Sequence, residues 1–125
     1  MLFDTDVLIW VLRGNPEAAK TVEKADRRYV SVVTYMELLQ ESRDRREVKT
    51  IRSFLTQFAF QMLPLTENIG HRAAIYMEEY SLKVAMCMAD ALLAATAVES
   101  QLVLCSGNRK HYGPIGELDV SVFGP

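Results

Sequence analysis

Short apolar runs alternate with longer helical segments along the whole chain, and this alternation most constrains the fold. Strand-like runs rich in Val, Leu and Phe are predicted at residues 2–7, 28–33, 60–65, 102–105 and 120–123. Helical patterns occupy the segments between them, namely one starting at Asn15–Pro16, then 34–43, 46–58, 66–81 and 87–100, with a loop expected at 106–116. This order predicts an α/β three-layer sandwich with a mostly parallel central sheet flanked by helices.

The composition is that of a soluble globular protein, and the length suits one domain spanning residues 1–125. The most apolar stretch, residues 85–98, is interrupted by Asp90, so no membrane-spanning helix is expected. No basic segment precedes an apolar run at the start, which argues against a signal peptide and favours a cytoplasmic protein. Cys87 and Cys105 have apolar neighbours and are predicted to be reduced core residues.

The net charge of −2 argues against a nucleic-acid-binding protein, which is usually basic. Two local runs, residues 43–52 and 109–111, are nevertheless basic. The ordinary interpretation of such runs is a solvated helix face or loop. His111 is interpreted as a structural or substrate-facing residue, because no nucleophile pattern accompanies it.

Several acidic side chains occupy positions where burial would be costly. Asp4 and Asp6 follow the first apolar run, and functional groups in parallel sheets gather beyond the carboxyl ends of strands. Glu37 and Asp90 lie in helical segments with apolar neighbours, where an acid needs a partner or a metal. A cluster of oxygen ligands without His or Cys ligands favours Mg²⁺ or Mn²⁺, which serve phosphoryl chemistry.

Each of these residues also has a purely structural interpretation. Glu37 completes a capping box with Thr34, and Asp6 would cap the turn after the first strand. Asn108 follows a glycine and suits a turn. Asp90 is predicted in the middle of its helix, so capping explains it poorly, whereas a buried pair with an arginine remains open.

Four segments, in order, resemble the PIN-domain ribonucleases, and most closely the VapC toxins of prokaryotic toxin–antitoxin pairs. The segments are "LFDTDVLIWVLRGN", "VSVVTYMELLQ", "MADALLAATA" and "LCSGNRKHYGPIGELDV". Together they cover almost the whole chain. Two departures are visible: Asn108 stands where many relatives have aspartate, and no glycine shortly precedes Asp90.

The resemblance implies a PIN-like fold and metal-dependent hydrolysis of an RNA phosphodiester. It implies that Asp4, Asp90 and Glu37 hold Mg²⁺ or Mn²⁺ and that Asn108 joins them in catalysis. Asp6 and Ser106 would orient water or the metal ligands, and Arg109 and Lys110 would contact RNA. The implied partners are an RNA substrate, a cognate VapB-type antitoxin and a second copy of the chain.

Two other functions remain open. A degenerate PIN fold would act only as a binding module, although three charged candidate ligands argue against it. The stretch "DTDVL" is also similar to the opening of haloacid-dehalogenase phosphatases, but Leu8 stands where that motif needs Thr or Val. The apolar stripe Ile51, Phe54, Leu55 and Phe58 is a possible dimer surface, and its ordinary interpretation is a core-facing helix side.

Overall fold

The computed structural model describes residues 1–124 and contains a five-stranded, all-parallel sheet. Its strands are β1 (Leu2–Phe3), β2 (Tyr29–Ser31), β3 (Gln61–Leu63), β4 (Leu104–Ser106) and β5 (Val120–Val122). They lie in the order β3-β2-β1-β4-β5, so β1 is central and pairs with both β2 and β4. The predicted α/β sheet architecture is confirmed.

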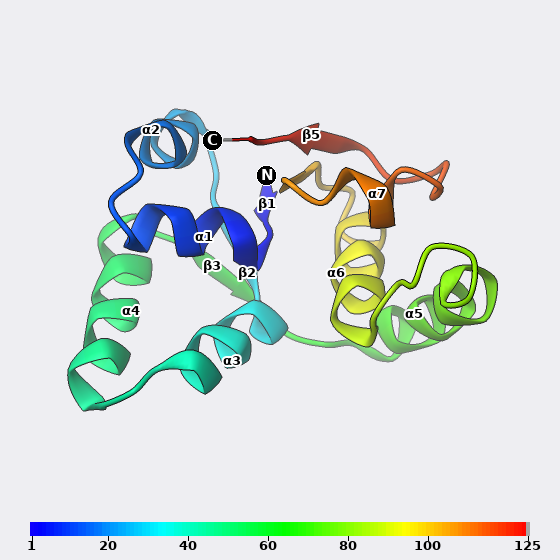
Figure 1. The fold of residues 1–125 in the computed structure, drawn as a ribbon, viewed down its shortest axis with the longest axis horizontal. Coiled ribbons are helices and arrows are strands. Elements are labelled where there is room, and N and C mark those ends of the chain that lie inside the picture. The colour runs from blue at the N-terminus through cyan, green and yellow to red at the C-terminus, as the bar shows by residue number, and fades with distance from the viewer. Residues whose placement is uncertain (125) are drawn as a thin grey trace.

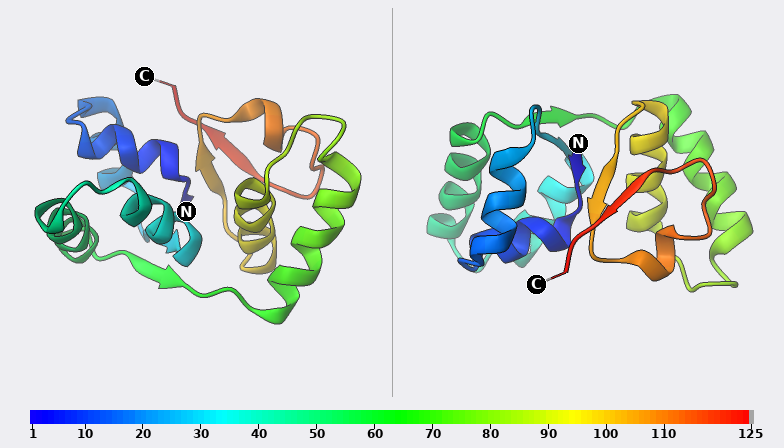
Figure 2. Two further views of the ribbon diagram at one scale, coloured as in Figure 1. Left: turned by 60° about the horizontal axis from the view of Figure 1, so that its bottom comes forward. Right: turned by 90° about the horizontal axis from the view of Figure 1, so that it is seen from above.

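Helices cover both faces of this sheet, as Figures 1 and 2 show. They are α1 (Thr5–Leu12), α2 (Pro16–Lys24), α3 (Val32–Glu41), α4 (Arg45–Gln57), α5 (Glu67–Tyr80), α6 (Met88–Glu99) and the single turn α7 (Arg109–Tyr112). Helices α1 to α4 lie on one side of the sheet, and α5 and α6 lie on the other (Figure 1). The sandwich therefore has three layers.

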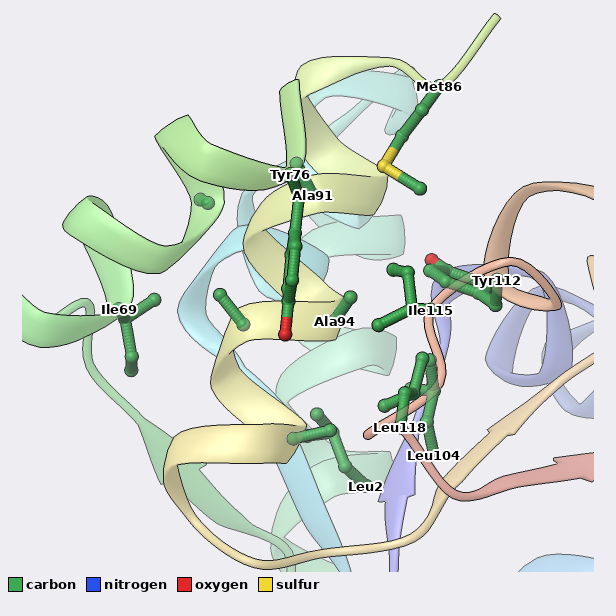
Figure 3. Packing of buried hydrophobic residues seen from close by; sticks show 13 residues of the cluster. Leu2, Ile69, Tyr76, Met86, Ala91, Ala94, Leu104, Tyr112, Ile115 and Leu118 are labelled. Atoms are coloured by element: carbon green, nitrogen blue, oxygen red, sulfur yellow. The ribbon is translucent and has the colours of Figure 1, made fainter. Parts of the chain in front are cut away.

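Two apolar cores follow from the alternation of side chains along the central strands. Leu2 and Leu104 belong to the cluster with α5 and α6, whereas Phe3 and Cys105 belong to the cluster with α1 to α4. Four buried alanines of α6 let α5 pack closely against it, with Tyr76 of α5 lying across the contact (Figure 3). Both faces of β1 and β4 are consequently buried.

Two helix caps that the sequence predicted are present in the structure. Asn15 caps α2 by accepting a hydrogen bond from the Ala18 amide at 2.9 Å, and Thr66 caps α5 in the same way. The stripe Ile51, Phe54, Leu55 and Phe58 packs into the core, which confirms the core-facing interpretation. In the described part of the chain, no helix has the length and apolar character needed to cross a membrane.

The structure corrects several predicted boundaries. The first strand was expected to reach Val7, but it ends at Phe3 because Asp4 caps α1. The second ends at Ser31, which caps α3, and the loop predicted at 106–116 contains α7. Cys87, expected in the core, is exposed, because it lies just before the start of α6 at the surface.

Candidate functional site

The candidate site begins at the carboxyl ends of β1 and β4. Asp4 follows β1 and Ser106 ends β4, and the Ser106 hydroxyl donates to Asp4 Oδ2 at 2.7 Å. β2 lies on one side of β1 and β4 on the other, so the chain order reverses here. Such a switch point is where open parallel sheets usually place their sites.

Asp4 is buried, with 6% of its surface exposed, and hydrogen bonds reach both of its carboxylate oxygens. The Thr5 amide donates to Oδ1 at 2.7 Å, and the Tyr112 hydroxyl donates to Oδ2 at 3.2 Å beside Ser106. Burial, and then the nearby charge of Asp6, raise the pKa of Asp4 to about 6, although the Ser106 hydrogen bond opposes the rise. The fold therefore holds Asp4 at an energetic cost.

Asp90 lies in the first turn of α6, at its third residue, and not in mid-helix as the sequence predicted. The Cys87 amide and thiol both contact Asp90 Oδ2, at 3.4 Å and 3.1 Å, so capping accounts for part of its placement. His111 Nδ1 lies 2.6 Å from the same oxygen. The alternative of an arginine pair is wrong, since the partner is a histidine.

Glu37 extends from α3 toward α1. The cap of α3 is Ser31, which accepts from the Val33 amide, so the predicted capping box with Thr34 does not form. Glu37 Oε1 instead accepts a hydrogen bond from the Thr5 hydroxyl at 2.6 Å. Glu37 is thus held beside the residue that follows Asp4.

Asp6 ties the start of α1 to the loop after β4. Its Oδ1 accepts from the Val7 amide at 2.7 Å and its Oδ2 from the Gly107 amide at 2.9 Å. A Cβ at position 107 would lie 2.8 Å from the Phe123 carbonyl oxygen and 2.9 Å from Asp6 Oδ2, so glycine is needed there. Burial raises the pKa of Asp6. The sequence suggested that Asp6 caps the turn after the first strand, but Asp4 caps α1, and Asp6 lies within the first turn of that helix and holds the loop after β4.

Asn108 caps α7 and contacts His111 twice. Its amide nitrogen Nδ2 lies 3.0 Å from His111 Nδ1, and its Oδ1 accepts from the His111 backbone amide at 3.4 Å. The turn role predicted for Asn108 is confirmed in this form. Arg109 and Lys110, which follow, are exposed at the rim.

The sequence did not single out Tyr112 or Thr5, and both are central to the arrangement. The Tyr112 hydroxyl lies 3.2 Å from Asp4 Oδ2 and 3.3 Å from Asp90 Oδ1, and the side chain is fully buried. Burial raises the pKa of Tyr112 well above its ordinary range, so the hydroxyl stays protonated. In the sequence, the only indication of this contact is that Tyr112, an aromatic residue, directly follows His111.

The donor set fits a hard divalent cation. Among residues 1–124, no Lys or Arg forms an ion pair with Asp4, Asp6, Glu37 or Asp90. In the same residues no three acidic, imidazole or thiol side chains converge on one metal position. Mg²⁺ commonly binds through one or two carboxylates and keeps several waters, which Asp4 and Asp90 satisfy.

A separate groove runs between α1, α3 and α4, with a volume of about 570 Å³. It mixes apolar and charged side chains, and none of the candidate site residues lines it. Its lining comprises Ile9, Leu12, Arg13, Leu38, Glu41, Ser42, Arg43, Glu47, Thr50 and Ile51. The groove and Glu37 share helix α3, on which Leu38 lines the groove and Glu37 contacts Thr5.

Comparison with solved structures shows close similarity over nearly the whole chain. A toxin–antitoxin complex from Klebsiella pneumoniae matches with a TM-score of 0.82 and 26% identity, covering 97% of this chain and 95% of that one. VapBC-1 from nontypeable Haemophilus influenzae matches with a TM-score of 0.81 and 21% identity, covering 97% and 96%.

VapBC2 from Rickettsia felis, bound to a DNA fragment from its promoter, matches with a TM-score of 0.81 and 14% identity, covering 98% of each chain. No curated protein matches the sequence. The family model of the PIN domain matches residues 1–113. The chain therefore belongs to the PIN domain family.

Proposed function

We propose that this protein is a metal-dependent endoribonuclease toxin of the VapC type, neutralised by a cognate antitoxin. The observation that carries the proposal is the meeting of Asp4 and Asp90 at one hydroxyl, at the switch point of a PIN-domain sheet and without a Lys or Arg partner in residues 1–124. Structural neighbours that are toxin–antitoxin complexes support the physiological role.

In this proposal Asp4 and Asp90 hold Mg²⁺ or Mn²⁺, and Glu37 contributes through water. When bound, such a cation lowers the pKa of water and neutralises charge on phosphate oxygens. The chain's own groups orient these ligands: Ser106 donates to Asp4, Asn108 Oδ1 accepts from the His111 backbone amide, and His111 Nδ1 faces Asp90. Asp6 keeps the loop after β4 in place through the Gly107 amide.

The exposed Arg109 and Lys110 would contact the RNA phosphates at the rim of the site. Such contacts are electrostatic and carry no sequence information, so they position a strand without selecting it. The proposal includes a cytoplasmic location, where an RNA substrate would be available.

The antitoxin would engage two places at once. An amphipathic helix would lie in the groove between α1, α3 and α4, where Ile9, Leu12 and Leu38 offer apolar contacts. An arginine of the same peptide would reach the carboxylates and compete with the cation. A second copy of the chain is also part of the proposal, and light scattering at high concentration should report a homodimer.

The deciding experiment is sequencing of RNA ends after brief induction of the protein in cells, beside the variant Asp4→Asn. We expect new ends at defined positions that carry a 5′-phosphate and a 3′-hydroxyl, and none with the variant. Purified protein that retains RNA but cleaves none at any Mg²⁺ or Mn²⁺ concentration would favour a binding module instead.

A further inference from the structure

Consecutive residues of the one-turn helix α7 reach both oxygens of Asp90. His111 Nδ1 lies 2.6 Å from Asp90 Oδ2, and the Tyr112 hydroxyl lies 3.3 Å from Asp90 Oδ1. The same hydroxyl lies 3.2 Å from Asp4 Oδ2. Tyr112 is therefore the side chain that touches both aspartates, which come from different elements on opposite halves of the sequence.

We infer that Tyr112 is a positioning residue, whose hydroxyl holds the Asp4 and Asp90 carboxylates at the spacing that binds one divalent cation. The inference rests on the proposed function. Two ionised carboxylates repel each other. Cys87 and His111 contact only Oδ2 of Asp90, whereas the Tyr112 hydroxyl contacts Oδ1, the oxygen that shares this hydroxyl with Asp4. A buried hydroxyl in contact with both carboxylates limits their movement before the cation arrives.

The placement of Tyr112 supports a role beyond core packing. Its ring is fully buried in the cluster with Leu104, Ile115 and Leu118, which fixes the position of the hydroxyl (Figure 3). The hydroxyl lies at the end of the buried ring and contacts one oxygen of each of the two carboxylates. Hydrogen bonds to metal ligands commonly contribute tenfold to hundredfold in metal affinity, because they orient the ligands.

The same core contains a matched control. Tyr76 is also buried in this cluster, and its hydroxyl also donates to a carboxylate, that of Glu117, but it does not contact the candidate site residues. Tyr76→Phe and Tyr112→Phe each remove one buried hydroxyl and leave the ring. Any effect common to both variants reports stability, and an effect confined to position 112 reports the site.

The experiment measures Mn²⁺ binding by electron paramagnetic resonance of the free ion, with the metal alone and no RNA. We expect Tyr112→Phe to raise the Mn²⁺ dissociation constant about tenfold and Tyr76→Phe to change it less than about twofold. In the cleavage assay, the Mn²⁺ concentration for half-maximal rate should rise in parallel for Tyr112→Phe, while KM for RNA at saturating metal stays unchanged.

Equal or tighter Mn²⁺ binding by Tyr112→Phe would overturn the inference. Wild-type protein that binds no Mn²⁺ would overturn the proposed metal site together with it, so the two failures are distinguishable. A second measurement covers the case in which Tyr112→Phe does not fold. In wild-type protein labelled with ¹³C at tyrosine Cζ, Mg²⁺ should shift the Tyr112 signal and leave the Tyr76 signal in place; an unmoved Tyr112 signal contradicts the inference.

Discussion

Asp4, a candidate site residue, is buried at the expense of folding stability. The residue is 6% exposed, and its pKa of about 6 lies above the ordinary value of 3.8, chiefly because of burial. Below about pH 4 the group is neutral in both folded and unfolded chains. As pH rises from about 4 to 6, the unfolded chain loses its proton first, so folding stability falls through this window.

Asp4→Asn should therefore stabilise the metal-free protein relative to wild type as pH rises. The raised pKa predicts that the difference in unfolding free energy between variant and wild type grows by about 2 kcal/mol between about pH 4.5 and pH 7.5. Urea denaturation in a chelator at both pH values measures it. The exposed Asp119→Asn is the control, and an Asp4→Asn difference that does not change with pH would show that burial of this carboxyl carries no such cost.

At the scale of elements, a polar contact joins two helices beside the site. The Thr5 hydroxyl, in the first turn of α1, lies 3.0 Å from the Thr34 hydroxyl and donates to Glu37 at 2.6 Å on α3. Hydrogen bonds to charged groups are the stronger class, and Glu37 is half-buried. Thr5 thus fixes α3 against the start of α1, directly after Asp4.

Thr5→Val, which keeps the side-chain shape, should remove this contact without disturbing packing. We expect the free energy of unfolding to fall by about 1 to 2 kcal/mol and the cleavage rate to fall as Glu37 loses its orientation. Thr50→Val is a matched control, because the Thr50 hydroxyl bonds only the Arg46 carbonyl oxygen within its own helix at the surface. Equal effects of both substitutions on cleavage would argue against a role for the contact.

At the scale of the whole molecule, the groove and the candidate site carboxylates are formed by different residues. The groove is formed by α1, α3 and α4, whereas Asp4 follows the central strand β1 and Asp90 lies in the first turn of α6. A peptide long enough to occupy both would bind in the groove and block the site. Substitutions in the groove should then separate inhibition from catalysis.

Leu12→Glu should weaken inhibition by the antitoxin while leaving RNA cleavage by the free protein unchanged. Leu12 lines the groove, and a carboxylate there is costly to bury under an apolar helix face. Ile75→Glu on α5, an exposed apolar position away from the groove, is the control. Inhibition that survives Leu12→Glu unaltered would direct the search for the antitoxin surface elsewhere.

Competition at the metal should be visible in the wild-type protein. At a fixed ratio of antitoxin to toxin, increasing Mg²⁺ or Mn²⁺ should weaken inhibition of RNA cleavage, because arginine and cation share the same oxygens. Replacing that arginine with alanine should abolish the metal dependence. Inhibition that stays constant across the metal titration would leave groove binding as the whole mechanism.

The sequence by itself determined the layers and the list of acids, because both depend on local chemistry. Alternating apolar runs and helical patterns predict a parallel sheet, and carboxylates among apolar residues indicate a site wherever the chain folds. Asn15, Thr66 and the stripe on α4 were readable for the same reason: their roles depend on neighbours within a turn or two.

Only the tertiary structure decided which acids meet. β1 lies beside β4, and the chain that follows β4 forms α7, whose Tyr112 contacts both Asp4 and Asp90. The contact between Tyr112 and Asp4 spans 108 residues of sequence, and the contact between Tyr112 and Asp90 spans 22. Glu37 looked like half of a capping box, yet Ser31 caps α3 and Glu37 turns to Thr5. Pairings across such distances depend on strand order and helix start points, and a local pattern contains neither.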